Sequence, residues 1–486
     1  MNTTFTDEEK LEYAGMDYLR SGVKEPETVY DLYVNNYPFL YLPENLRLAN
    51  NVIYFSIRDS WNVDWNHAST LINQFPKLKK LYLVSNNFEV VPFSASKLTG
   101  LEELLIENNR NLHIERAMSE ISKLKSLKKL ALFTLPYSQL PDEVLNLQNL
   151  EEIWIGANDS LDYEQHFKIL KKMKKLQALT IVEFQHSRLP KGLGELRLKE
   201  LTLEDCKKLD YEQVFNDVGN FDSLTFLRIR GTELEYLPEN IRRFENLKTL
   251  KLIENRQLNF DSLSEDLTFL TNLEELNLDA SDANPPHKPA SPHRLPEGIA
   301  TLKNLKTLIL DNLSYLDLYH GIDLMKKLPV LEKLSLEYIS DYEYGGNVFV
   351  LPSSFSELTT LEKLNLNLTG PYTFDSLTTL PPNLTHLSKN ESALEVFPPL
   401  ILELKHLKSL RLKENRLTEI PPEISRLKNL VHLDLSKNKL EDLPDEIAEL
   451  KNLRFLQISE NPLSEDEEKQ ERIRKLLPNT VISFYY

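Results

Sequence analysis

Residues Leu430–Asn438 read LVHLDLSKN, and the phrase L-x-x-L-x-L-x-x-N decides the fold because it recurs from residue 29 onward. Other clear copies are Leu78–Asn86, Leu101–Asn109, Leu407–Asn415 and Leu453–Asn461. Eighteen copies begin at residues 29, 52, 78, 101, 127, 150, 176, 198, 224, 247, 273, 305, 331, 361, 384, 407, 430 and 453. Repetition at a fixed period of roughly 20–50 residues is typical of a solenoid.

The L-x-L alternation inside each phrase predicts a short strand with one buried face. Such strands stack in parallel about 4.8 Å apart. The phrase resembles the leucine-rich repeat family, and the resemblance covers residues 29–463, about nine-tenths of the chain. It implies an α/β repeat fold, a curved horseshoe with parallel strands on the concave face and helical or extended returns on the convex face.

The ninth position of the phrase is asparagine in seven copies: Asn86, Asn109, Asn158, Asn255, Asn415, Asn438 and Asn461. In the family that the phrase resembles, these side chains turn inward and form a ladder of hydrogen bonds to neighbouring coils. Cys206, the only cysteine, occupies the same position. We therefore expect a structural role for Cys206.

Two repeat lengths, mostly 23 and 26 residues, alternate through much of the chain. The shorter type contains Leu-Pro, as at Pro141 and Pro238, which predicts an extended or tightly helical return. The longer type predicts a helical return, with Asp162 and Asp210 as N-caps followed three residues later by glutamine.

Residues 1–28 are predicted to form an N-terminal helical cap and residues 464–486 a C-terminal cap, because terminal coils expose apolar surface. Two insertions, 282–294 and 340–350, interrupt the rhythm. Lys389 falls where the third buried leucine of its phrase belongs. Burial of an unpaired lysine is costly, so we expect its side chain to point outward or its strand to be distorted.

The formal net charge of −17 argues against nucleic acid or an anionic membrane as the main partner. A single cysteine favours a reducing compartment. The N-terminal sequence has no signal-peptide pattern, and no apolar run is long enough to span a membrane. These features predict a cytoplasmic protein, although export by a signal-independent route stays open.

The sequence contains no recognisable catalytic or cofactor-binding motif: we find no phosphate-binding loop, no zinc pattern and no nucleophile elbow. His287 and His293 share the proline-rich insertion, where an ordinary solvated loop is the favoured interpretation. The sequence therefore predicts a protein that is not an enzyme and has no cofactor and no metal.

Positions three, five and seven of each phrase should face the concave side. One block there is apolar, and it comprises Tyr82, Val84, Leu105, Phe133, Trp154 and Val182. A contiguous exposed apolar patch indicates an interaction site, and Trp and Tyr are frequent anchors of binding. Arg228 and Arg230 follow nearby and are predicted to orient a partner.

The sequence favours a non-enzymatic protein-recognition scaffold that binds a protein partner on its concave face. One alternative is a structural spacer or self-associating protein that uses the same patch. Another is a regulatory subunit, or an effector delivered to another cell. The short repeats resemble those of cytoplasmic scaffold proteins and of many bacterial proteins.

Overall fold

The computed structural model describes residues 29–485 apart from 159, 218–220, 233, 256, 281–293, 314–315 and 340–348. The predicted cap 1–28 and most of both insertions therefore lie outside the described residues. The chain divides into two compact units, Met1–Phe226 and Leu227–Tyr486.

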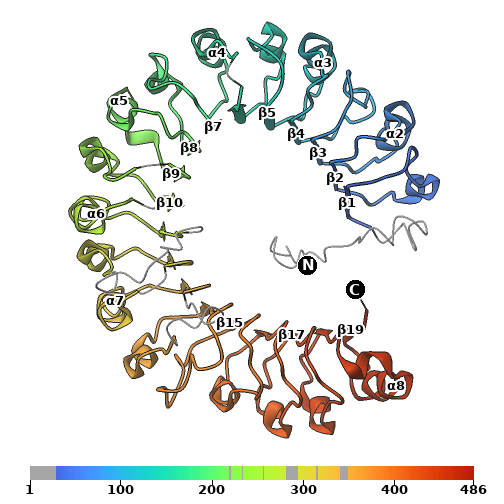
Figure 1. Ribbon diagram of the computed structural model, residues 1–486, viewed down its shortest axis with the longest axis vertical. Helices are drawn as coiled ribbons and strands as arrows, with labels where there is room; N and C mark the ends of the chain where they lie inside the picture. Colours follow the sequence, from blue (N-terminus) through green and yellow to red (C-terminus); the bar gives the residue numbers. More distant parts are fainter. Residues whose placement is uncertain are drawn as a thin grey trace. The chain divides into compact units, whose positions relative to one another are not determined.

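In the first unit, drawn from blue to green in Figure 1, the strands lie on the inner side and the helices on the outer side. The strands are β1 Asp31–Asn35, β2 Tyr54–Arg58, β3 Lys80–Val84, β4 Glu103–Glu107, β5 Lys129–Phe133, β6 Glu152–Gly156, β7 Ala178–Val182 and β8 Glu200–Glu204. Each strand pairs in parallel with the next, so Leu81 aligns with Leu104 and Leu104 with Leu130. The same phrase position therefore recurs at the same height on neighbouring strands.

The returns of the first unit follow the two predicted repeat types. The longer returns are helical: α2 Trp65–Ile72, α3 Ile114–Ile121, α4 Tyr163–Leu170 and α5 Tyr211–Asp217. Three of the shorter returns contain 3₁₀ turns, η3 Glu44–Leu48, η4 Asp142–Asn146 and η5 Leu193–Leu196, and a further 3₁₀ turn, η6 Phe221–Ser223, follows α5 in its longer return. The N-cap prediction is confirmed, because the side chains of Asp162 and Asp210 accept hydrogen bonds from the backbone N–H groups of Gln165 and Gln213, both at 3.1 Å.

The second unit continues the same pattern. Strand β9 spans Phe226–Arg230, and the strands after it are β10 Thr249–Ile253, β11 Glu275–Asn277, β12 Thr307–Ile309, β13 Lys333–Ser335, β14 Lys363–Asn365, β15 His386–Ser388, β16 Ser409–Arg411, β17 His432–Asp434, β18 Phe455–Gln457 and β19 Val481–Ser483. The α-helices are α6 Phe260–Leu267, α7 Leu318–Met325 and α8 Glu467–Leu476. The 3₁₀ turns are η7 Glu239–Arg243, η8 Glu297–Thr301, η10 Ser353–Glu357, η11 Pro399–Glu403, η12 Pro422–Arg426, η13 Asp445–Glu449 and η14 Pro462–Glu465.

The interior of each unit is filled by the leucines of the phrase and closed by the predicted ladder. Leu250 and Leu252, for example, are buried. Asn109 donates from Nδ2 to the carbonyl oxygens of Leu83 (2.9 Å) and Glu107 (2.7 Å). Because buried backbone groups need partners, these amides hold one coil against the next. The α/β leucine-rich repeat solenoid predicted from the phrase is confirmed.

Cys206 sits in the ladder as expected. Its buried thiol lies 3.2 Å from the carbonyl oxygen of Glu204, and burial raises the pKa of the thiol to about 12. A thiol that stays protonated at neutral pH is a poor nucleophile, which fits a structural role.

The residue before the ladder position has a left-handed backbone in nearly every coil. Examples are Ser85, with a φ of 50°, Glu254, with 57°, and Glu460, with 53°. A positive φ bends the chain sharply at the end of each strand. The bend turns the following ladder side chain into the interior.

The prediction for Lys389 is wrong. Its side chain points into the interior and is fully buried, and strand β15 keeps its register, with Leu387 opposite Leu410. The physical reason is that oxygen acceptors from the preceding coil receive the amine, as described below.

Candidate functional site

The apolar side chains predicted on the strands of the first unit do gather in one place. Val84, Leu105, Ala131 and Phe133 form a packed cluster, and Tyr82 and Trp154 pack against it. We call these six residues the β3–β6 patch. The parallel register produces it, because Tyr82 aligns with Leu105, Leu105 with Ala131, and Ala131 with Trp154.

The expectation that the patch faces solvent is wrong for its apolar members. Val84, Leu105 and Phe133 are only 5%, 8% and 9% exposed. Side chains on strands about 4.8 Å apart shield one another when large residues occupy the same register position. Tyr82 and Trp154 are only partly buried, so the accessible part of the patch is aromatic.

Three other predicted site residues do not join the patch. Val182 is buried and lies outside the cluster. Arg228 and Arg230 lie on β9 in the second unit, where both are partly buried. The Arg230 guanidinium binds Glu254 Oε1, with Nη2 at 2.8 Å and Nε at 3.1 Å.

A chain of ion pairs borders the patch, and the sequence prediction missed it. Lys80 Nζ lies 3.2 Å from Glu103 Oε2, and Lys129 Nζ lies 3.5 Å from Glu103 Oε1. Lys129 also pairs with Glu152 Oε1 at 3.2 Å. The signal in the sequence is the alternation of charge at position three of consecutive phrases, since these four residues align across β3–β6.

Trp154 is held by both parts of this surface. Its Nε1 donates to Glu152 Oε1 at 2.5 Å, and Lys129 Nζ lies 4.3 Å from the ring centroid. The Phe133 ring centroid is 6.2 Å away. A ring fixed by a hydrogen bond, a cation–π contact and an aromatic neighbour is preorganised.

Tyr82 is tied to the charged chain through its hydroxyl, which donates to Glu103 Oε1. Burial and this acceptor raise the pKa of Tyr82, so the phenol stays protonated. Burial of Glu103 favours its neutral form, but the Tyr82 hydroxyl, Lys129 and Lys80 outweigh burial and lower the pKa of Glu103. The carboxylate is therefore ionised at neutral pH and keeps its three partners.

Aromatic rings extend from the patch toward β1. The ring centroids of Tyr33 and Tyr54 are 5.0 Å apart, and so are those of Tyr54 and Tyr82. The accessible surface of the first unit thus combines aromatic rings with paired charges.

The strands of the second unit carry a polar surface. Asn365 Nδ2 donates to Glu337 Oε2 at 2.7 Å, and the backbone N–H of Glu337 donates to Asp311 Oδ1 at 2.8 Å. Burial, reinforced by the charges of Glu337 and Asp279, raises the pKa of Asp311 to about 6.

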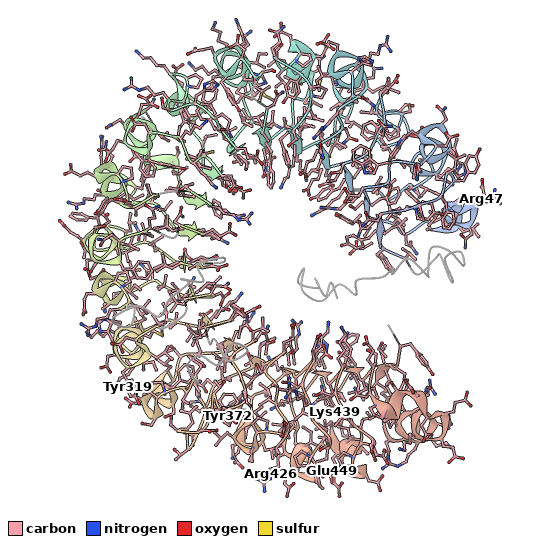
Figure 2. All side chains as sticks on the ribbon, in the orientation of Figure 1. Arg47, Tyr319, Tyr372, Arg426, Lys439 and Glu449 are labelled. Atoms are coloured by element: carbon pink, nitrogen blue, oxygen red, sulfur yellow. The ribbon has the colours of Figure 1, made fainter. Side chains whose placement is uncertain are left out.

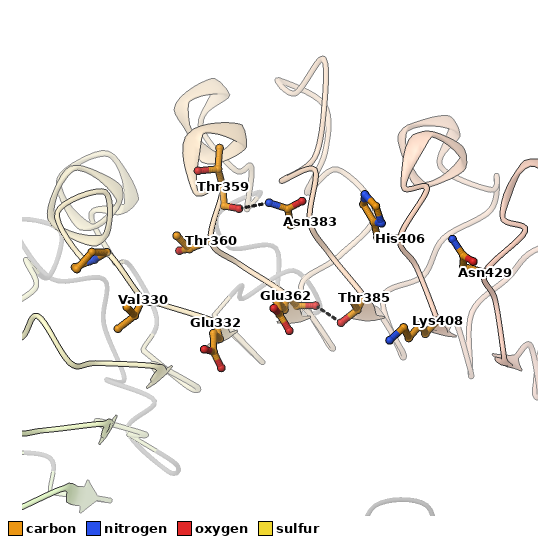
Figure 3. A pocket seen from close by; sticks show the side chains of 11 residues that line it. Val330, Glu332, Thr359, Thr360, Glu362, Asn383, Thr385, His406, Lys408 and Asn429 are labelled. Carbon is orange, nitrogen blue, oxygen red and sulfur yellow. Dashed lines mark hydrogen bonds between the residues drawn. The ribbon is translucent and has the colours of Figure 1, made fainter.

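A shallow groove of about 790 Å³ lies beside the strands of the second unit, between residues 329 and 429 (Figure 3). Its polar side chains largely serve the fold. Asn383 Nδ2 donates to the carbonyl oxygen of Thr359 at 2.7 Å, and Thr385 Oγ1 donates to that of Glu362 at 3.1 Å. These two side chains therefore tie neighbouring coils together.

In the described part of the chain, no group of three or more His, Cys, Asp or Glu side chains is placed to hold a metal ion. No helix in that part is long and apolar enough to cross a membrane. What the described strand surface offers is a set of fixed aromatic and charged side chains.

Comparison with known families identifies the repeat. Residues 196–403 match the family model of a leucine-rich repeat region, and residues 405–463 match the leucine rich repeat model. Because these matches span more than half of the chain, the protein belongs to the leucine-rich repeat family. Proteins of this family generally act as protein-interaction scaffolds and are typically not enzymes.

Two solved structures are similar to the chain over most of its length. A leucine-rich repeat protein of Leptospira interrogans is 26% identical, with 97% of this chain and 99% of that chain covered and a TM-score of 0.38. TLR13, in a complex with ssRNA13, is 18% identical, with 93% of this chain and 83% of that chain covered and a TM-score of 0.46. No curated protein matches the chain.

Proposed function

We propose that this protein is a non-enzymatic scaffold that recognises a protein partner through the strand surface of its first unit. The observation that carries the proposal is the β3–β6 patch, in which the partly exposed rings of Tyr82 and Trp154 stand over a packed apolar cluster. Large aromatic side chains at the centre of an interface often dominate binding energy.

Preorganisation supports the proposal. Trp154 and Tyr82 are each hydrogen-bonded to a carboxylate. Their side chains are therefore already fixed before a partner binds. Rigid anchors strengthen association because less conformational entropy is lost. The role we assign to the buried members, Val84, Leu105 and Phe133, is to support the rings. Val182, on β7, pairs with Gly156 of β6 beside them.

The polar and charged surroundings define the kind of partner. The net charge of −17 disfavours nucleic acid and anionic membranes. Separately from the patch, we propose that Arg228 and Arg230, on β9, orient a partner through its acidic groups. The single buried thiol fits a reducing compartment, and we propose the cytoplasm as the location.

Capture from native lysate tests the proposal. We would compare wild type with Trp154→Ala and with the matched control Tyr319→Ala, which removes an exposed ring on α7, on the outer side of the second unit (Figure 2). Circular dichroism first establishes that both variants are folded. A partner retained by the control and weakened at least tenfold by Trp154→Ala supports the proposal.

Equal retention of the partner by both variants would show that the patch is not the binding surface. Light scattering of the purified protein tests the alternative, in which the protein associates with a second copy of itself. A dimer that dissociates on Trp154→Asp but not on Tyr319→Asp would assign the patch to contact between two copies of this chain.

A further inference from the structure

The side chain of Lys389 occupies the interior of the coil that begins at residue 384, in the place of a leucine. The backbone there is regular: Lys389 N donates to the carbonyl oxygen of Arg411 at 2.9 Å, and Lys389 O accepts from Asn415 Nδ2 at 2.9 Å. The lysine side chain therefore fills the space of a leucine in the core, and the ladder beside it stays intact.

The amine of Lys389 meets three neutral oxygens, all from the return of the preceding coil. Nζ lies 2.9 Å from Thr369 Oγ1, 2.8 Å from Thr373 Oγ1 and 2.8 Å from the carbonyl oxygen of Gly370. We call these three oxygens the tripod. An ammonium group has three N–H donors, so the tripod satisfies every one.

No carboxylate takes part in these contacts. Burial lowers the pKa of Lys389 to about 7, and in the described residues burial is the only cause. The titratable side chains on the segments around it are Lys363, Tyr372, Asp375, His386, Glu391, Arg411 and Lys413. Among the described residues, the protonated amine is thus a buried charge without a counter-ion.

The tripod also accommodates the neutral amine. The Thr369 hydroxyl donates to the carbonyl oxygen of Leu366 at 2.6 Å and so stays an acceptor for Lys389. Gly370 O accepts the second N–H. The Thr373 hydroxyl, which lies 3.0 Å from Gly370 O, can turn and donate to the amine lone pair. Both protonation states are hydrogen-bonded, and they differ in the buried charge.

We propose that Lys389 and its tripod form a proton-controlled latch on residues 369–374, in which the neutral amine holds the segment closed and protonation favours its opening. The segment carries Tyr372, which is exposed and is labelled in Figure 2. Its carbonyl at Thr373 accepts from the backbone N–H of Leu351 at 2.9 Å, so opening also releases Leu351.

The sign of the pH dependence follows from proton binding. In the open segment the amine regains its ordinary value of 10.5, whereas in the closed segment its pKa is about 7. Between these values the open state binds more protons, so closing becomes more favourable as pH rises, up to about tenfold per unit. Below pH 7 both states are protonated, and the latch is at its weakest and independent of pH.

Hydrogen exchange of the full chain between pH 6 and pH 9 tests the latch, with rates corrected for intrinsic exchange. The reporters are the amides of Leu351 and Thr369, and the internal control is the Leu435 amide, which donates to Gln457 O on the next strand. In wild type, the opening constant of the reporters should fall about tenfold per pH unit above pH 7.5, while that of the control stays flat.

Two variants remove the titration in opposite ways. Lys389→Met removes the titrating amine, so the opening constant of the reporters should not change with pH. Lys389→Arg should give reporters that open readily at every pH, because the guanidinium does not lose its proton. A wild-type opening constant that does not change with pH would overturn the proposal, and so would the same pH dependence in Lys389→Met.

Discussion

Replacing the ladder residue Asn438 with alanine should destabilise the second unit strongly. Asn438 is 7% exposed, and its Nδ2 donates to the carbonyl oxygens of Leu412 (2.9 Å) and Leu435 (3.0 Å). Its Oδ1 accepts from the backbone N–H of Leu417 at 3.1 Å. Alanine removes these bonds, two of which reach the preceding coil, at Leu412 and Leu417.

The magnitude follows from the groups that lose their bonds. A buried donor or acceptor left unsatisfied costs about 1–3 kcal/mol. The Leu412 carbonyl keeps a bond from Asn415 Nδ2 at 3.0 Å, so the group left unsatisfied is the Leu417 N–H. The expected loss in the free energy of unfolding is therefore roughly 1–3 kcal/mol.

Asn452 supplies the matched control for this measurement. Its exposed side chain makes one bond, from Nδ2 to the carbonyl oxygen of Lys428 at 2.8 Å. Asn452→Ala should cost less than about 1 kcal/mol, because water replaces the lost partner. Urea denaturation followed by circular dichroism measures both losses. Similar losses for the two variants would refute the reasoning that burial of the ladder amide sets its energetic role.

Three further predictions concern other parts of the chain. Leu252→Ala should cost roughly 2–5 kcal/mol, with hydrogen exchange rising mainly in adjacent coils; uniform loss of protection would contradict this. Trp154→Ala should cost about 1–2 kcal/mol, because its ring packs on Phe133 and Lys129, and an unchanged melting temperature would show that these contacts add nothing. The raised pKa of Asp311 means that the folded state holds its proton longer than the unfolded state. Stability should therefore fall as pH rises from about 4 to 6, and Asp311→Asn should flatten this part of a denaturation-versus-pH curve.

The phrase predicted the strands, the ladder and the two kinds of return because these are local features repeated at one period. The N-cap at Asp162 was accessible for the same reason, since its partner lies three residues away. Such features need no knowledge of contacts between distant residues.

The burial of side chains on the strand surface could not be predicted from the sequence in this way. Phe133 is shielded by residues of neighbouring strands, and a pattern within one phrase carries no information about that shielding. The inward direction of Lys389 has the same origin. Its acceptors at 369–373 read as an ordinary turn, and only the packing of two coils reveals that three oxygens converge.

The left-handed residue at the end of a strand allows the stability of its coil to be changed separately from that of other coils. A non-glycine residue such as Glu460 pays about 1–2 kcal/mol for a positive φ, whereas asparagine adopts it more readily and already does so at Asn108 and Asn312. This position is neither an interior leucine nor a strand residue that would meet a partner. Substitutions at this one backbone position could therefore raise the stability of individual coils. The added stability would allow residues on the strand surface to be changed without loss of the fold.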